Sequence, residues 1–251
     1  MKVLGFIKKV VKAFVPYGLL YLWRKKGHGT PIPAQDQNVI TCLTSSLTGW
    51  LNDNDIIALE YGIRHIKTQF PAIEIGSFCG LSTNIISYYM RKYNKNNPLF
   101  CSDKWTADSW ADRIKNLKPE ITIENYHDFL KESFINNCRM FSRTNLPYAI
   151  EEFSDDFFSL WENNKCVKDV FGRDAELGGN ISFAFIDGMH TYDFAKRDFY
   201  STDKYMVKGG HIFMHDTFDG GPLETLVKEI IKEGRYCVIM KNPNYLLRKE
   251  I

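Results

Sequence analysis

Short apolar runs alternate along the chain with longer segments in which apolar residues recur every three or four positions. The first pattern is typical of strands buried on both faces, and the second of helices with one apolar side. The expected strands are residues 72–75, 99–102, 148–150, 181–186, 211–214, 236–240 and 245–248. The expected helices are residues 52–67, 82–92, 154–161, 192–205 and 223–232. Residues 106–145 are expected to be mostly helical, and residues 162–180 to form a polar connection.

This regular alternation predicts the fold class. Strands separated by helices favour a parallel sheet with helices on both faces. Asn52 is suited to cap the first helix, and Gly209-Gly210 is expected to turn the chain into strand 211–214. The turn at residues 242–244 predicts a closing hairpin. We therefore expect an α/β protein with a Rossmann-like, mostly parallel seven-stranded sheet, an antiparallel edge hairpin at its C-terminal end and an N-terminal helical arm.

Charge divides the chain into two unlike parts. Its 251 residues suffice for one α/β domain with extensions. Of the 32 Lys and Arg residues, seven lie in the first 35 positions, where none of the 30 acids occurs. We therefore divide the chain into a basic arm with a linker, residues 1–35, and a mildly acidic domain, residues 36–251. Such an acidic domain lacks the positive field that phosphates require, so no nucleic acid partner is expected.

The basic arm is too short in apolar sequence to cross a membrane. Its longest uncharged run, residues 13–23, has 11 residues, whereas a spanning helix needs about 20. Arg24-Lys25-Lys26 follows that run in place of a signal-peptide cleavage site. Two roles stay open for residues 1–26. They can pack on their own domain or on a second subunit in a homodimer, or they can rest on an anionic membrane surface.

The six cysteines favour a cytoplasmic protein. No two of them are separated by two or three positions, so neither a zinc knuckle nor a CxxC redox motif is present. A chain of this length also builds its core without disulfides. We expect reduced thiols in the cytoplasm, with attachment to the cytoplasmic face of a membrane as the alternative that the basic arm leaves open.

The candidate chemistry lies where the expected parallel strands end, because ligands bind at the carboxyl edge of such sheets. Gly76 and Gly80 follow the strand at residues 72–75 with G-x-x-x-G spacing, which is a poor cradle for a pyrophosphate. Asp103 ends the strand at residues 99–102 and is placed to accept hydrogen bonds from ribose hydroxyls. A ribose without a pyrophosphate points to S-adenosylmethionine. A tight turn without a ligand is the alternative.

Three motifs resemble a known family. Residues 74–83, EIGSFCGLST, resemble the first motif of class I S-adenosylmethionine-dependent methyltransferases, in the branch with EIGSxxGxST. Residues 185–192, FIDGMHTY, are similar to that branch's IDGxHxY motif, and residues 208–216, KGGHIFMHD, to its PGG…HD ending. The resemblance covers residues 50–250. The proteins that this chain resembles include macrocin-type sugar O-methyltransferases and cephalosporin-hydroxylase-like proteins.

The resemblance implies which residues bind the cofactor. Gly76 and Gly80 would let its methionine part pass close to the backbone. Glu74 would hold the turn or face the cofactor's amino group. Asp103 would bind the ribose. The full set that the resemblance implies is Glu74, Gly76, Ser77, Phe78, Gly80, Ser82, Thr83, Asp103, Lys104, Trp105, Ser154 and Asp187.

A metal site is also implied, because some members of the branch bind a divalent ion through acids at two neighbouring strand ends. Asp187 and Asp216 occupy those positions here, and His215 stands where several metal-dependent relatives carry a second acid. Two carboxylates suit Mg²⁺, and the histidine shifts the preference toward Mn²⁺ or Fe²⁺. In the alternative without metal, Asp216 caps a loop and Asp187 only orients the cofactor.

His190, Asp187 and His215 are the candidate catalytic residues. A histidine of near-neutral pKa can take the proton of an attacking hydroxyl, and His190 in the IDGxHxY motif is the candidate base. Residues 106–148 are long for a strand–helix connection and could form a lid. Arginines in that segment would suit an anionic acceptor.

The predicted function is an S-adenosylmethionine-dependent O-methyltransferase of a small polar acceptor. A sugar or phosphorylated precursor of a bacterial surface polysaccharide is the first substrate class, and an antibiotic sugar is the second. Two further functions stay open. One is a metal-dependent oxygenase of the cephalosporin-hydroxylase-like type, and the other is a partner protein that keeps the fold without turnover.

Overall fold

The computed structural model describes residues 32–106 and 121–251. Within these residues a seven-stranded sheet has the order β3-β2-β1-β6-β7-β9-β8. Its strands are β1 Ala72–Ile75, β2 Leu99–Ser102, β3 Tyr148–Ile150, β6 Ile181–Ile186, β7 Met206–Met214, β8 Tyr236–Lys241 and β9 Tyr245–Lys249. Neighbouring strands in the row β3-β2-β1-β6-β7 pair in parallel, and β9 pairs antiparallel with both β7 and β8. The predicted sheet with its antiparallel edge hairpin is confirmed.

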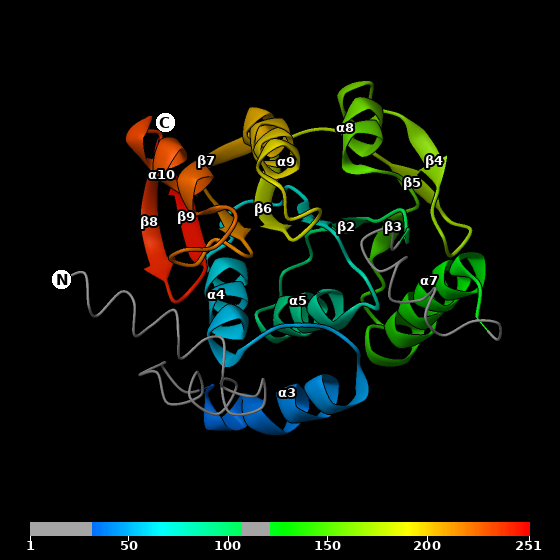
Figure 1. The fold of residues 1–251 in the computed structure, drawn as a ribbon. Helices are drawn as coiled ribbons and strands as arrows, with labels where there is room; N and C mark the ends of the chain where they lie inside the picture. Colours follow the sequence, from blue (N-terminus) through cyan, green and yellow to red (C-terminus); the bar gives the residue numbers. More distant parts are fainter. Residues whose placement is uncertain (1–31, 107–120) are drawn as a thin grey trace. The chain divides into compact units, whose positions relative to one another are not determined.

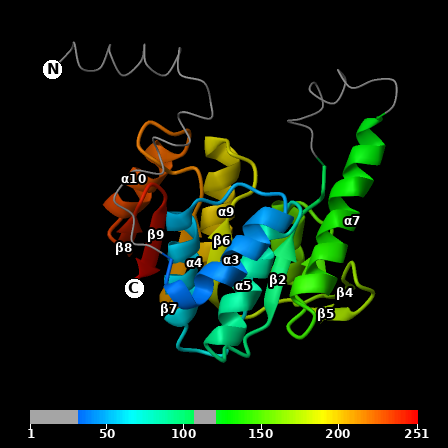
Figure 2. The ribbon, with the colours of Figure 1, turned by 90° about the horizontal axis from the view of Figure 1, so that it is seen from below.

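Helices cover both faces of this sheet (Figure 1). One face carries α3 Ala34–Ser46, α4 Asp53–Arg64, α5 Leu81–Lys92 and α7 Ile123–Phe141. The other carries α8 Ser154–Glu162, α9 Tyr192–Tyr205 and α10 Glu224–Lys232. Viewed from below, α3 lies across the outer side of α5 (Figure 2). The expected three-layer α/β arrangement is therefore confirmed.

Alternating side chains of the central strands pack into two separate hydrophobic cores, one on each face of the sheet. Ala72 of β1 and Phe183 of β6 pack under α4 and α5. Ile73 and Ala184, their neighbours along the chain, pack under α8, α9 and α10. Every residue of β1, β2 and β6 is buried. Burial on both faces explains why these strands are continuous apolar runs in the sequence.

The start of α4 confirms the predicted cap. The Asn52 side chain accepts hydrogen bonds from the backbone N–H groups of Asn54 and Asp55, and the Asp55 carboxylate accepts from the Asn52 N–H at 3.0 Å. This reciprocal pair is a capping box, which satisfies N–H groups that have no partner within the helix.

Two connections differ from the sequence expectation. The strand expected at residues 211–214 begins earlier, at Met206, so Gly209 and Gly210 lie within β7 and not in a turn before it. The pairing with β6 shifts register there, and an irregular strand of this kind has no clear pattern of alternation. The polar connection at residues 162–180 contains a small hairpin of β4 Cys166–Lys168 and β5 Asp174–Glu176. Its strands are mostly exposed and too short to show periodicity.

Helix α3 overlaps the predicted linker, which extends through residue 35. Its Asp36 is fully buried and accepts hydrogen bonds from Lys92 and Tyr88 of α5, so the helix is held by a buried ion pair. The membrane and subunit roles proposed for residues 1–26 lie outside the described residues. Among the residues that the structure does describe, no helix has both the length and the apolar character needed to cross a bilayer.

Candidate active site

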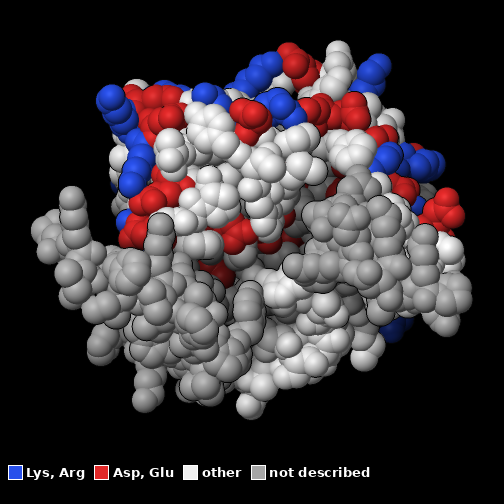
Figure 3. Space-filling model, viewed as in Figure 1, with Lys and Arg blue, Asp and Glu red and all other residues white. Residues whose placement is uncertain are grey.

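The predicted site residues meet at the carboxyl edge of the sheet, as the topology requires. Gly76 follows β1, Asp103 follows β2, Asp187 follows β6, and Asp216 lies two residues beyond β7. Backbone hydrogen bonds continue past the strand ends, from Asp187 N–H to Ile75 C=O at 2.8 Å for example. In the view of Figure 3 the surface is hollowed near its centre, with Asp and Glu side chains in the hollow. The edge is thus rich in acids.

The turn after β1 requires glycine at its first position. Gly76 has φ +83°, and a Cβ atom there would lie 2.2 Å from the carbonyl oxygen of Asp187. Such a contact is far inside van der Waals distance, and both partners are backbone. Gly80 has φ +86° and precedes the first residue of α5. The turn therefore brings its backbone directly against the end of β6.

Glu74, in strand β1, supports this turn through hydrogen bonds. Its carboxylate is fully buried and accepts hydrogen bonds from Ser77 Oγ at 3.0 Å, from Thr83 Oγ1 and from the Cys101 thiol. The second oxygen, Oε1, has no hydrogen-bond partner among the described residues. Burial raises the pKa of Glu74 to about 7, although the hydrogen bonds, Ser82 included, oppose the rise. The hydrogen bonds to Ser77 and Thr83 are those expected of the first role considered for Glu74, which is to hold the turn.

Asp103 braces the same turn from its other side. Its Oδ2 accepts hydrogen bonds from the backbone N–H groups of Ser77 and Phe78, each at 2.8 Å, and its Oδ1 accepts from Trp105 N–H at 2.6 Å. Burial raises the pKa of Asp103, and these three donors oppose the rise. The buried Trp105 indole donates to Phe78 C=O at 2.8 Å. Asp103 thus shapes the turn that the sequence analysis assigned to the cofactor.

Two of the predicted cofactor residues have polar partners outside this turn. Lys104 donates to Glu151 C=O at 3.0 Å and forms an ion pair with Glu152, so its ammonium is held at the end of β3. The Ser154 hydroxyl interacts with Asp198 on α9. Burial raises the pKa of Asp198 to about 6, and the hydrogen bond from Ser154 opposes that rise.

An aromatic side chain that the sequence analysis missed lies beside the turn. The Trp50 ring is 59% exposed, and its centroid lies 5.2 Å from that of Phe78. Trp50 lies between α3 and α4, outside the three motifs, and a single tryptophan in a loop carries no pattern that could have identified it.

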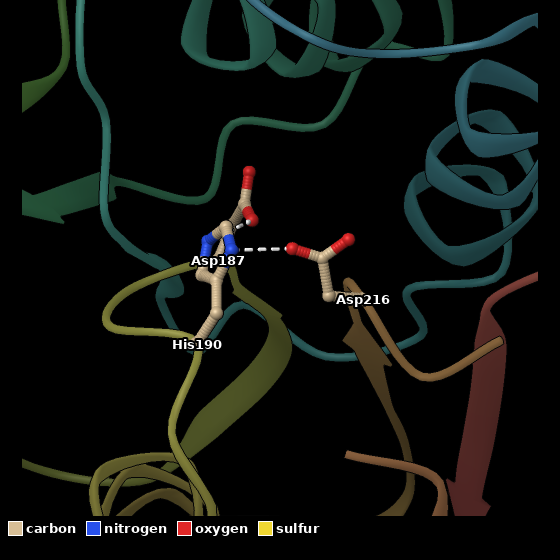
Figure 4. Close-up of side chains that lie close together, drawn as sticks. All are labelled: Asp187, His190 and Asp216. Atoms are coloured by element: carbon tan, nitrogen blue, oxygen red, sulfur yellow. Dashed lines mark ion pairs between the residues drawn. The ribbon is translucent and has the colours of Figure 1, made fainter. Parts of the chain in front are cut away.

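Asp187, His190 and Asp216 form a compact cluster next to the turn (Figure 4). His190 Nε2 lies 3.4 Å from Asp187 Oδ1, and its Nδ1 contacts Asp216 Oδ2. Hydrogen bonds to Asp187 and Asp216 raise the pKa of His190 to about 10, against the opposing effect of partial burial. The His190 side chain is half exposed, so the cluster is open to an incoming substrate.

This cluster has a donor set that fits a divalent cation. One ligand atom from each of the three residues lies within 4.8 Å of the others. The two carboxylates match the preference of Mg²⁺ for oxygen ligands. Together with the imidazole they match the preference of Mn²⁺ for mixed oxygen and nitrogen ligands. The sequence motifs predict Asp187, Asp216 and His215 as ligands. In the structure His190 completes the group instead.

His215 lies behind this cluster and is largely buried. Its Nδ1 lies 3.0 Å from Asp187 Oδ1, and its Nε2 lies 3.5 Å from Asp55 Oδ2. Burial opposes the charged form, but Asp187 and Asp55 outweigh it and raise the pKa of His215 to about 11. His215 is thus an ion-pair bridge between Asp187 and Asp55, a place that the sequence did not indicate.

Asp55 is a further site residue that the sequence analysis missed. It is 1% exposed, and its Oδ1 accepts a hydrogen bond from Asn244 Nδ2 at 2.9 Å. The same Asn244 side chain accepts from Thr217 N–H, directly after Asp216. Helix α4, the β8–β9 turn and the end of β7 therefore converge behind the acid cluster. The capping of α4 is enough to explain an acid at position 55, so nothing in the sequence indicates that Asp55 also contacts the site.

The predicted lid is described only in part. Residues 107–120, with Arg113, lie outside the described residues. Within α7, Phe134 and Cys138 are fully buried in the core, which anchors that helix to the domain. The Arg139 guanidinium lies 5.9 Å from the centre of the Phe171 ring.

Comparison with known proteins identifies the class. Residues 73–217, more than half of the chain, match the family described as a methyltransferase domain. The chain therefore belongs to this methyltransferase family. No curated protein sequence matches it.

Solved structures share the fold. The SAH-bound methyltransferase PaMTH1 of Podospora anserina has a TM-score of 0.56 at 10% identity, covering 95% of this chain and 99% of its own. The calicheamicin methyltransferase CalS11 has a TM-score of 0.55 at 14% identity, covering 95% and 96%. The SAH complex of a Bacillus cereus O-methyltransferase has a TM-score of 0.52 at 13% identity, covering 88% and 92%. The fold of this chain is accordingly the class I methyltransferase fold.

Proposed function

We propose that this protein is an S-adenosylmethionine-dependent O-methyltransferase. The observation that carries the proposal is the adjacency of two features at one sheet edge. One is the glycine turn held by Asp103 and Glu74, where the cofactor would bind. The acid–histidine cluster lies directly beside it, because Gly76 packs against the backbone of Asp187. Membership of the methyltransferase family supports the same conclusion.

The turn and its supports would hold the cofactor. S-adenosylmethionine supplies a methyl group on a positively charged sulfur. Gly76 lets the turn pack directly against the end of β6, and the acidic edge favours a cation. Asp103 Oδ1 accepts only one hydrogen bond from the described residues and keeps a free lone pair for a ribose hydroxyl. Ser77, Phe78, Gly80, Ser82 and Thr83 shape the turn.

His190 would act as the base. With no cation in the cluster, the neutral form of the His190 ring would take the proton of the acceptor hydroxyl while the hydroxyl oxygen bonds to the methyl carbon and the carbon–sulfur bond breaks. Asp187 and Asp216 raise the pKa of His190 to about 10, so the neutral form, and with it the rate, is expected to increase as the pH rises toward that value. Asp187 and Asp216 hold the imidazole from two sides and stabilise the charge that it gains. His215 and Asp55 hold Asp187 in place from behind. Each of these groups touches the next, so the base is oriented before the acceptor binds.

The acceptor that we propose is a sugar or a phosphorylated precursor of a bacterial surface polysaccharide, with an antibiotic sugar as the alternative. A neighbouring structure, that of a TDP-rhamnose 3′-O-methyltransferase with a TM-score of 0.50 and 15% identity, supports the sugar class. The half-exposed His190 and the exposed Trp50 provide a polar group and a flat apolar surface, which together suit a sugar ring. We place the enzyme in the cytoplasm as a homodimer, with residues 1–26 as the segment for subunit or membrane contact.

An acceptor screen tests the function itself. Nucleotide sugars and phosphorylated sugars incubated with the protein and S-adenosylmethionine are expected to give a product heavier by one CH₂ group, detected by mass spectrometry. A product heavier by one oxygen atom, formed with iron and dioxygen, would support the oxygenase instead. Tight cofactor binding without any modified acceptor would contradict both enzymes and favour the partner protein that keeps the fold without turnover.

Replacing Asp103 by alanine is expected to weaken S-adenosylmethionine binding by at least about a hundredfold. One hydrogen bond from a ribose hydroxyl to this charged acceptor contributes roughly 1.5–3 kcal/mol, and each 1.4 kcal/mol is a factor of ten. The variant also loses the three backbone hydrogen bonds by which Asp103 shapes the turn, which weakens binding further. Calorimetric titration measures the affinity, and Asp156→Ala on the exposed side of α8 is the matched control. Unchanged affinity in Asp103→Ala would remove Asp103 from the cofactor site.

Divalent cation binding to the acid cluster is a separate prediction. Mn²⁺ added to chelator-treated protein is expected to give a bound signal in electron paramagnetic resonance. Asp216→Asn should weaken that binding about tenfold or more, since one charged ligand is lost. His215→Asn should retain most of it, because His215 contacts Asp187 from outside the ligand group. The opposite order of the two variants would restore His215 as the ligand.

A further inference from the structure

A second cavity lies at the opposite edge of the sheet from the candidate active site. Its volume is about 260 Å³, and it opens where β6 and β7 begin and where β9 ends. The side chains that line it include Lys67, Lys208, Arg248 and Lys249, together with His65 and His211. We propose that this cavity binds a small phosphate-class anion, either free phosphate or the phosphate group of a small metabolite.

The balance of charge in the cavity favours an anion. Glu250 is the one acid among the described residues that line it. Arg248 forms an ion pair with Glu250, and Lys249 with Asp203. Lys67 and Lys208 are exposed and form no ion pair within the described part of the chain. Two cations therefore remain for a ligand.

His211 shows the effect of this positive field. The residue is 3% exposed, it lines the cavity, and its Nδ1 has no hydrogen-bond partner among the described residues. Burial lowers the pKa of His211 to about 4, and the charges of His65, Arg248 and Lys67 add to that effect while Glu250 opposes it. Burial disfavours a charge of either sign, whereas the positive charges of His65, Arg248 and Lys67 also attract a negative ligand.

Size selects a small ligand. Pockets for drug-sized ligands or cofactors have volumes of about 300–1,000 Å³, and this cavity is below that range. Gly209 lies on its wall with φ +79°, and a Cβ at this position would meet nothing within 4 Å. The backbone of β7 is thus open to close approach there. A phosphate-sized oxyanion, which accepts hydrogen bonds from lysine and backbone donors, fits this wall.

Calorimetric titration of the full chain with inorganic phosphate, and separately with glycerol 3-phosphate, tests the site. Sodium chloride keeps the ionic strength constant, and each titration is made with and without saturating S-adenosylhomocysteine, which blocks the candidate cofactor site. The double variant Lys67→Gln/Lys208→Gln is expected to bind at least about tenfold more weakly than the natural chain, since two charged donors are lost. Lys165→Gln, which removes an exposed cation from the loop between α8 and β4, is the matched control and should bind normally.

Each outcome decides the proposal. Loss of binding in the double variant alone supports the site, and the probe that binds more tightly identifies the source of the phosphate. Equal binding in all three proteins, or no binding of either anion, would overturn the proposal. The same follows if S-adenosylhomocysteine abolishes anion binding, because the anion would then occupy the cofactor site. Both lysines are exposed, so their replacement is compatible with folding, which a thermal unfolding curve verifies.

Discussion

Replacing Gly76 with alanine is expected to lower the free energy of unfolding by about 2–5 kcal/mol and to abolish cofactor binding. At φ +83° an L-residue costs about 1–2 kcal/mol, and crowding in a packed region costs about 1–3 kcal/mol more. The new Cβ would lie 2.2 Å from the Asp187 carbonyl oxygen. Neither partner can rotate away, because both are backbone. Relief of the contact must separate the turn from the end of β6.

Gly172→Ala is the matched control for this experiment. Gly172 has φ +82°, nearly the same as Gly76, and nothing lies within 4 Å of its Cβ position. It therefore carries the conformational cost of alanine without the steric one. Denaturant unfolding measures both variants, and the difference between them isolates the close approach of β1 and β6. Equal losses in the two variants would show that the active-site turn has room for a side chain.

Replacing His190 with alanine is expected to lower the rate of methyl transfer by about 10²–10⁴-fold, the usual contribution of a positioned base. Affinity for S-adenosylmethionine should stay nearly unchanged, because His190 contacts Asp187 and Asp216 and not the glycine turn. Single-turnover measurements give the rate, and calorimetry gives the affinity. His127→Ala on α7, a histidine outside the three motifs, is the matched control. Full turnover in His190→Ala would place the base on another residue.

Much of the fold was predictable because both faces of the sheet are covered. The strands at residues 72–75, 99–102 and 181–186 have the predicted bounds, since burial on both sides requires continuous apolar residues. The Asn52 cap was predictable because its partners are within three residues. The β4–β5 hairpin was not, because its short strands are mostly exposed and show no pattern.

The acids of the site were predictable from the sequence, but their partners were not. Once the strand ends are known, Asp103, Asp187 and Asp216 must gather at one edge of a parallel sheet. Their partners do not follow from that rule. Asp55 meets His215 across 160 positions of sequence, and Asn244 meets Asp55 across 189. Contacts of this kind depend on how helices pack over the sheet and how the chain closes.

The sequence by itself determined the class of this protein, the order in which the site residues follow the strands, and the glycine turn. Short segments of sequence suffice for these features, because they depend on local patterns and on the parallel arrangement of the strands. The tertiary structure decided the division of roles between the histidines. His190 lies between two carboxylates at the open edge, whereas His215 is buried between Asp187 and Asp55. It also decided that Lys67, Lys208 and Arg248 surround one cavity. Distances of a few ångströms between remote segments produce these differences, and only the packed chain sets such distances.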